Sequence, residues 1–254
     1  MIFAAGLGTR FKPWTDKHPK ALAIVNGKSL LQRNVEYLQQ YGIKDVIVNV
    51  HHFADQIIDV IDKSNGWGSN IIISDETDEL LETGGGLLKA KGLFKPGERF
   101  ITCNADFLTD LDINKLIEFH EQKKSLITFA VTNRKTSRYL LFDEDYRLCG
   151  WRNVNTGQDR ISISKNNYIE KAYSCVVVFE YDILKQRLRE MAFLTRGLKI
   201  TLRDMRVEEG EKPIEEHFHY EGGIKEFVSY LNKSKTVIYD QIMYFEGDRN
   251  NVHV

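Results

Sequence analysis

The sequence has few cysteines, almost no net charge and no long apolar run. Only three cysteines occur in 254 residues, and Cys103, Cys149 and Cys175 are far apart along the chain. An odd number of widely spaced cysteines forms neither a disulfide framework nor a zinc site. Such usage is typical of a protein kept in a reducing compartment, so we expect a cytoplasmic location.

The charge and hydropathy of the sequence argue against nucleic-acid-binding and membrane-spanning proteins. The formal net charge is −1, which does not favour a surface for nucleic acid or membrane. No apolar run has the length of a membrane-spanning helix, and the short apolar start lacks the basic residues of a signal peptide. No repeat or low-complexity linker is present. We therefore expect a globular protein whose partners are small molecules, with no nucleic acid and no membrane among them.

A glycine-rich string opens the chain, with the sequence MIFAAGLGTR over residues 1–10, and Lys20 follows within the string HPKAL. A short apolar strand that runs into small residues allows many backbone N–H groups to face a phosphate chain. Arg10 and Lys20 add the cations that bind phosphate oxygens. The string lacks the Gly-Lys-Ser/Thr of a P-loop and the third small residue of a dinucleotide fingerprint. A tight turn remains the alternative. The nucleotide contacts expected in this loop are Ala5, Gly6, Gly8 and Thr9.

Strand and helix patterns alternate along the first part of the chain. The expected strands are 45–50, 70–74 and 100–103, and the expected helices lie at 29–42, at 54–61 and after Asp112. Ser29 and Gln32 have the spacing of a capping box, and Asp112 is a second helix cap. Such alternation predicts an α/β domain with a Rossmann-like, mostly parallel sheet wrapped by helices. Ligands of such sheets bind beyond the carboxyl ends of the strands.

Two more strings follow strands of this sheet. Three consecutive glycines in LETGGGL (81–87) allow close approach to a flat ligand, and the helix expected after them offers free N–H donors. Gly84 and Gly85 are the candidate contacts, although a flexible surface turn is the alternative. Asp106 follows the strand 100–103, where a hard carboxylate is suited to Mg²⁺ shared with substrate phosphates. A capped turn is the alternative for Asp106.

Weaker signals lie at the ends of two other strands. His51 and His52 follow the strand 45–50, where a helix cap or a packed ring is the more common role. Asp75 and Glu76 follow the strand 70–74, where a charged turn is the ordinary explanation. His52, Asp75 and Glu76 are kept as candidate substrate contacts.

These motifs together resemble the sugar-1-phosphate nucleotidyltransferases, and most closely the small bacterial enzymes that activate N-acetylmuramate-1-phosphate or mannose-1-phosphate. The resemblance covers about residues 1–174 and implies a fold of the nucleotide-diphospho-sugar transferase type. It implies attack of a sugar-1-phosphate on the α-phosphate of a nucleoside triphosphate, with release of pyrophosphate. The family uses mostly uridine or guanosine nucleotides, and UTP is favoured here.

The resemblance also implies roles for individual residues. Arg10 holds the β- and γ-phosphates, and Lys20 lies near the α-phosphate. Gly84 and Gly85 contact the nucleobase. Asp106 binds Mg²⁺, which bridges the donor and acceptor phosphates. Because the nucleophile is already an anion, catalysis consists of positioning and charge neutralisation.

The resemblance to this family ends near residue 176, so the nucleotidyltransferase domain (1–176) is expected to be incomplete at its C-terminal side. The family has a second metal-binding Asp further on, and Asp182, Asp204 and Asp240 all lack its sequence context. Residues 177–254 resemble the B subunit of DNA gyrase, at the end of its ATPase domain and the start of its transducer domain. The matching strings are YDILKQRLREMAFL (181–194), LRD (202–204), HFHYEGGIK (217–225) and YLNKSK (230–235).

The chain is therefore expected to be a fusion in which a truncated α/β domain precedes a small α+β fragment. Helical patterns occur at 184–191 and 224–231, and a strand pattern occurs at 199–204. The gyrase functions are not expected here, since the ATP-binding helix and the transducer lysine lie outside the match. Two alternatives stay open beside the enzyme: a nucleotide-binding protein without turnover, and a topoisomerase fragment without ATPase activity. Apolar faces of the fragment predict docking on the first region or self-association.

Overall fold

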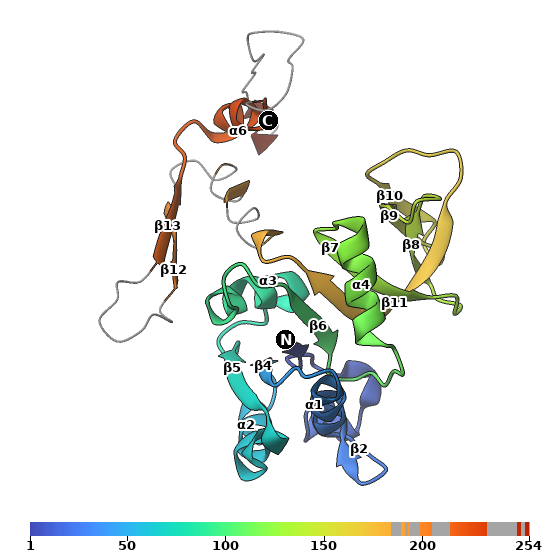
Figure 1. Cartoon of the computed structure of the whole chain (residues 1–254), viewed down its shortest axis with the longest axis vertical. Coiled ribbons are helices and arrows are strands. Elements are labelled where there is room, and N and C mark those ends of the chain that lie inside the picture. The colour runs from blue at the N-terminus through green and yellow to red at the C-terminus, as the bar shows by residue number, and fades with distance from the viewer. Residues whose placement is uncertain are drawn as a thin grey trace. The chain divides into compact units, whose positions relative to one another are not determined.

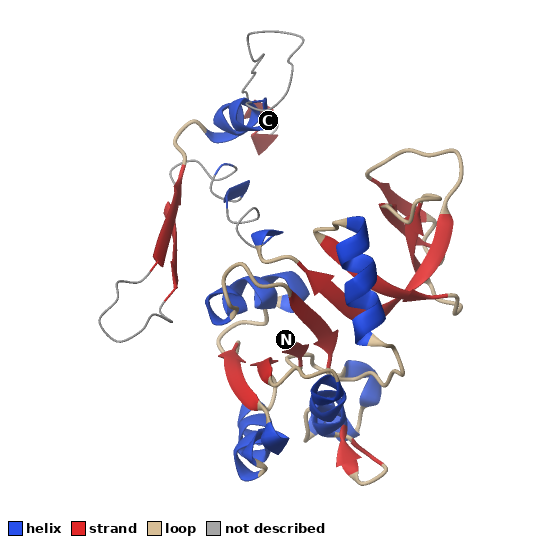
Figure 2. Cartoon of the chain, viewed as in Figure 1, coloured by secondary structure: helices blue, strands red, loops and turns tan. Residues whose placement is uncertain are grey.

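The computed structural model describes residues 1–183, 189–190, 193, 199–204, 214–232, 248–249 and 252–253. The chain divides into two compact units, Met1–Glu180 and Tyr181–Val254. Figure 1 labels the elements along the chain, and Figure 2 distinguishes its helices from its strands. In the first unit strands and helices alternate as far as residue 123, and five strands follow over residues 127–179.

A mixed sheet of nine strands forms the first unit. Its parallel part has the order β6 (Phe100–Asn104), β1 (Ile2–Phe3), β4 (Asp45–Val50) and β5 (Asn70–Asp75). The long strand β11 (Ile169–Phe179) joins β6 in the antiparallel direction. The predicted α/β class with a Rossmann-like sheet is confirmed, and the parallel pairing is confined to these four strands.

The remaining elements surround or extend this sheet. The helices of the first unit are α1 (Leu30–Gln40), α2 (Ala54–Lys63), α3 (Glu82–Lys89) and α4 (Ile113–Lys123). β2 (Ile24–Val25) and β3 (Lys28–Ser29) form a separate hairpin. The antiparallel strands are β7 (Ile127–Thr132), β8 (Arg138–Phe142), β9 (Leu148–Asn153) and β10 (Gln158–Ile161).

The predicted helix caps are present in the structure. The Ser29 hydroxyl accepts a hydrogen bond from the Gln32 backbone N–H at 3.1 Å, which begins α1. The reciprocal half of the capping box is absent, because the Gln32 side chain donates to Glu36 instead. Asp112 caps α4 by accepting from the backbone N–H groups of the second and third residues that follow it. These local signals set the starts of both helices.

A single apolar core joins β4 to the surrounding helices. Val46, Val48 and Val50 of β4 are buried, as expected for a strand covered on both faces. α1 contributes Leu31, Val35 and Leu38, α2 contributes Ile57 and Ile61, and α4 contributes Ile113 and Leu116. Burial of side chains of this size stabilises the fold by about 1.5–3 kcal/mol each. The core therefore fixes the edge of the sheet at which the glycine-rich loop emerges.

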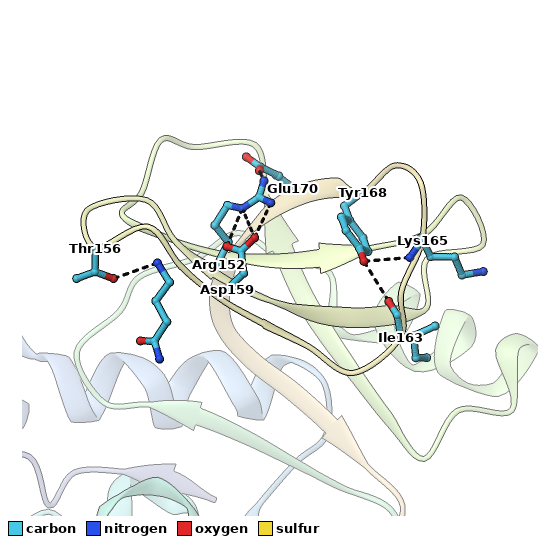
Figure 3. Close-up of polar contacts among 8 residues, drawn as sticks. Arg152, Thr156, Asp159, Ile163, Lys165, Tyr168 and Glu170 are labelled. Carbon is cyan, nitrogen blue, oxygen red and sulfur yellow. Dashed lines mark hydrogen bonds and ion pairs between the residues drawn. The ribbon is translucent and has the colours of Figure 1, made fainter.

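An antiparallel extension of the sheet is held by a charged cluster on β9, β10 and β11 (Figure 3). The Arg152 guanidinium donates to the Asp159 carboxylate at 2.7 Å and to the Glu170 carboxylate at 2.5 Å. Both bonds raise the pKa of Arg152. The bond from Arg152 lowers the pKa of Asp159. The pairs are about a third exposed, so they orient the strands more than they stabilise them.

The described elements of the second unit include a larger hairpin and the helix α6. β12 (Lys199–Asp204) pairs with β13 (Ile214–His219), and α6 spans Gly223–Asn232. A short pair, β14 (Asp248–Arg249) and β15 (Val252–His253), follows. The predicted strand 199–204 and helix 224–231 are confirmed. The helix predicted at 184–191 falls largely outside the described residues, and Asp240 lies entirely outside them.

Candidate functional site

The glycine-rich loop leaves the carboxyl end of β1 and turns sharply at Gly8. Gly8 has a φ of +61°, and a Cβ there would lie 2.8 Å from Thr15 Cγ2. Only glycine adopts this conformation without strain and fits against Thr15. The Thr15 hydroxyl also donates to the Gly8 carbonyl at 2.9 Å. The loop is therefore held in one shape by a buried threonine that the sequence pattern did not single out.

A cavity of about 350 Å³ lies beside this loop. Its lining comes from five segments that meet at the carboxyl ends of the parallel strands. The first segment is the loop, with residues 3–6 and 8–10, the second is Lys20 and Ala21, and the third is Asn49. The fourth supplies Glu76, Leu80, Glu82 and Thr83, and the fifth is residues 104–106. Of the predicted site residues, Ala5, Gly6, Gly8, Thr9, Arg10, Lys20, Glu76 and Asp106 line it. The loop, both cations and the carboxylate are thus brought together.

Lys20 and Asp106 are in direct contact across this cavity. The Lys20 ammonium donates to the Asp106 carboxylate at 2.5 Å, although the two residues are 86 positions apart. Both side chains are about one third exposed. Arg10 is exposed at the same cavity, so its guanidinium is accessible to an anion. The cavity thus offers cationic side chains and a hard carboxylate within one small volume.

Helix α1 fixes the backbone that presents Asp106. The buried Asn34 amide donates to the carbonyl oxygens of Ala105 and Phe107, at 3.0 Å and 3.3 Å. These two residues flank Asp106. Sequence reasoning missed this contact, although a buried amide on the apolar face of a helix is a signal that could have shown it. Asn34 therefore restricts where the Asp106 carboxylate can lie.

The triple glycine lies within a helix rather than before one. α3 begins at Glu82, so Gly84 and Gly85 occupy its first turn, and neither of them lines the cavity. The sequence predicted that the helix begins after the three glycines, and this prediction is wrong by a few residues. Glu82 and Thr83 of the same turn do line the cavity. A role of Gly84 and Gly85 toward a nucleobase stays a prediction.

The third glycine of the triplet packs against the residues beneath the cavity. A Cβ on Gly86 would lie 2.5 Å from Glu76 Oε1 and 3.0 Å from Asn49 Nδ2, whereas a Cβ on Gly84 would meet nothing within 4 Å. Gly86→Ala is expected to destabilise the fold by about 1–3 kcal/mol through overpacking. Gly84→Ala is the matched control and should stabilise by up to about 1 kcal/mol, as alanine does in helices. Urea unfolding of both variants measures the difference, and equal effects would contradict it.

Two of the predicted contacts lie away from the cavity. The Asp75 carboxylate accepts from the Thr77 backbone N–H at 2.8 Å, a bond that lowers the pKa of Asp75. This arrangement is the charged turn that was the alternative for Asp75. The His52 ring packs on Phe53, with ring centroids 4.1 Å apart. Neither residue lines the cavity, and their contact with substrate stays a prediction.

The side chains at the cavity fit a divalent cation that is shared with substrate. Within the described residues, no group of three or more His, Cys, Asp or Glu side chains is arranged to hold a metal ion. Mg²⁺ often takes only one or two carboxylates and completes its shell with water and substrate phosphates. Asp106 is such a carboxylate at the cavity, and it would hold the cation there.

A glycine-rich loop and a cavity lined by Arg10 and Lys20, at the carboxyl edge of the parallel strands, are typical of nucleotide-binding α/β proteins. The nucleotidyl transferase family model matches residues 1–142, which is more than half of the chain. The chain therefore belongs to the nucleotidyl transferase family. The resemblance to sugar-1-phosphate nucleotidyltransferases is confirmed.

Two curated relatives each match a part of the chain. N-acetylmuramate alpha-1-phosphate uridylyltransferase of Caulobacter vibrioides is 41% identical over 103 residues, 40% of this chain and 43% of the relative. The B subunit of DNA topoisomerase 4 from Enterococcus faecalis is 54% identical over 76 residues, 30% of this chain and 10% of the relative. The chain thus spans less than half of either relative. The sequence predicted a resemblance to the B subunit of DNA gyrase, and the match found is to the B subunit of DNA topoisomerase 4.

A solved structure shares the fold over most of the chain. The crystal structure of HddC from Yersinia pseudotuberculosis complexed with GMP-PN has a TM-score of 0.58 and 26% identity. The similarity covers 72% of this chain and 77% of HddC. No helix within the described residues combines the length and apolar character needed to cross a membrane.

Proposed function

We propose that the chain binds a nucleoside triphosphate in the cavity beside Gly8 and transfers its nucleotidyl group to a sugar-1-phosphate. The observation that carries the proposal is the meeting of Arg10, Lys20 and Asp106 at one cavity of about 350 Å³ beside the glycine-rich loop. In the transfer, a phosphate oxygen of the sugar-1-phosphate forms a bond to the α-phosphorus. The bond from that phosphorus to the bridging oxygen breaks, and pyrophosphate leaves with that oxygen.

The residues of this chain act by positioning and by charge neutralisation. The backbone of the loop at Gly6 and Gly8 receives the triphosphate, and Arg10 holds its β- and γ-phosphates. Lys20 stabilises the charge that develops around the α-phosphate. Mg²⁺, when bound at Asp106, supplies further neutralisation of phosphate charge. No proton has to be removed from the acceptor, because its phosphate is already ionised.

UTP is the proposed donor, and a sugar-1-phosphate of the amino-sugar or mannose type is the proposed acceptor. Support comes from the uridylyltransferase relative at 41% identity. GTP is the main competitor, since HddC was crystallised with a guanosine nucleotide analogue. We also propose that the site lacks the second metal-binding Asp of its family, so that turnover is slow.

Pyrophosphate release tests this function. The chain is incubated with Mg²⁺, with UTP, GTP, CTP or dTTP, and with a panel of sugar-1-phosphates. Release that depends on both substrates is the expected result, with UTP giving the highest rate. Nucleotide binding without release from any pair would instead favour a non-catalytic nucleotide-binding protein. That alternative is favoured by the partial coverage of the relative.

Self-association through the second unit is also proposed. Ile224 and Leu231 of α6 lie seven positions apart on one helical face, and they are 54% and 41% exposed. Exposed apolar faces of this kind favour association with another surface. Size-exclusion chromatography with light scattering is expected to show a dimer or larger species. A monodisperse monomer would contradict this proposal.

A further inference from the structure

A buried amide–carboxylate pair, Asn49 and Glu76, lies beneath the cavity and joins three of its walls. Asn49 Oδ1 accepts from the Ala4 backbone N–H at 2.7 Å, at the first residue after β1. Asn49 Nδ2 donates to Glu76 Oε1 at 2.8 Å. Asn49 is 2% exposed and Glu76 is fully buried. One side chain thus ties the start of the phosphate loop to a carboxylate that follows β5.

Glu76 in turn connects to the elements on the other side of the cavity. Its backbone N–H donates to the Val50 carbonyl at 2.8 Å, and its carbonyl oxygen lies 2.6 Å from His51 Nδ1. Helix α3 packs directly on its carboxylate at Gly86. α3 carries Glu82 and Thr83, which form the opposite wall of the cavity. Displacement of Glu76 therefore moves this helix relative to the loop.

The pair is not explained by stability alone. Glu76 Oε2 is buried and has no hydrogen-bond partner within the part of the chain that the structure describes. A buried acceptor without a donor destabilises the folded state, so the Glu76 carboxylate carries a cost that a fully hydrogen-bonded side chain would not have. What the pair supplies instead is a fixed separation between the loop and α3.

We propose that Asn49 and Glu76 are positioning residues that hold the phosphate loop and α3 at the spacing a nucleoside triphosphate requires. The inference rests on the proposed function, since it assigns the two walls to one nucleotide. It also makes a prediction about the free protein: loss of the pair releases the Ala4 N–H and loosens the loop. That prediction does not depend on catalysis.

A polarity swap tests the proposal. Asn49→Asp places a second carboxylate against Glu76 and removes the donor, so the two side chains repel each other. In the double variant Asn49→Asp/Glu76→Gln, the new amide at position 76 donates to the new carboxylate at position 49, which still accepts from Ala4. The swap therefore restores both bonds with the net charge unchanged. Glu76→Gln alone keeps an oxygen that accepts from Asn49 and serves as the matched single variant.

Two measurements are made on the full chain. Hydrogen–deuterium exchange of a peptide covering residues 4–10 should be faster in Asn49→Asp and return toward wild type in the double variant. Titration with UTP and with GTP should show an affinity loss of about tenfold or more in Asn49→Asp, as when the outer partner of a site residue is removed. The double variant should recover most of that affinity. Thermal melts show whether each variant folds. If Asn49→Asp does not fold, exchange and nucleotide affinity are compared between Glu76→Gln and the double variant.

The outcomes separate this inference from the proposed function. Unchanged exchange and unchanged affinity in Asn49→Asp would overturn the inference, while nucleotide binding by the wild type would leave the proposed function intact. Weak binding in the double variant, equal to that of Asn49→Asp, would also overturn it. A wild-type chain that binds no nucleotide contradicts the proposed function, and the nucleotide part of the inference fails with it.

Discussion

Replacement of Asp106 by asparagine is expected to slow pyrophosphate release by about 10³-fold, because a charged group that neutralises the transferring phosphates is lost. The asparagine keeps the size and one oxygen of the original side chain, so the turn held by Asn34 should persist. The change therefore removes charge with little change of shape. The measurement is the initial rate of release at saturating nucleotide, sugar-1-phosphate and Mg²⁺.

Asp110→Asn is the matched control for this substitution. Asp110 is an exposed aspartate four positions further along the chain, and it does not line the cavity. Its loss should leave the rate unchanged. An Asp106→Asn variant as active as the control would mean that the cation, if one is used, is held elsewhere. The assignment of Asp106 would then be wrong.

Replacement of Lys20 by methionine is expected to have two opposite effects. Turnover should fall by about 10²–10³-fold, because a preorganised cation near the reacting phosphate is removed. Binding of Mn²⁺ to the nucleotide-free chain should tighten. The Lys20 ammonium lies 2.5 Å from Asp106 Oδ2, so it competes with any metal ion for the same carboxylate. Methionine keeps much of the side-chain volume and removes that competitor.

Electron paramagnetic resonance of free Mn²⁺ measures the second effect without any turnover. Lys17→Met is the control, because Lys17 is exposed and does not line the cavity. Weaker Mn²⁺ binding in Lys20→Met than in the control would show that the lysine supports the metal site instead of competing for it. Retained turnover would contradict the role of Lys20 at the α-phosphate.

The sequence predicted the edge of the sheet at which the site lies. A loop after the first strand and an Asp after a later strand both had to reach the carboxyl edge, because the strands are parallel. The direct contact of Lys20 with Asp106 follows from that placement, although its distance does not. The same pattern of strand ends led to the prediction that Asp75 and His52 contact substrate, and the structure places both residues outside the cavity. Position at a strand end fixes the edge but not the direction of a side chain.

The buried supports of the site were harder to predict. Asn49 is a single amide in the otherwise apolar run VIVNV (46–50) of β4, and that departure from the pattern was a usable signal. The three glycines could not be separated by sequence, because their surroundings differ only in the folded chain: Gly86 faces Glu76, Gly85 faces Leu81, and Gly84 faces open space. The start of α3 was also misplaced, since three glycines suggest a loop by propensity. Packing against a buried carboxylate overrides that preference.

The central claim is that the cavity at Gly8 binds the triphosphate of a nucleotide, and equilibrium titration tests it most directly. The chain is titrated with UTP and with GTP, in the presence and absence of Mg²⁺, alongside Arg10→Ala. Arg138→Ala is the control, since Arg138 is an exposed arginine of β8 that does not line the cavity. Saturable binding to wild type and control that is strongly weakened in Arg10→Ala is the predicted result. No binding by the wild type, or equal binding by Arg10→Ala and the control, would contradict the claim.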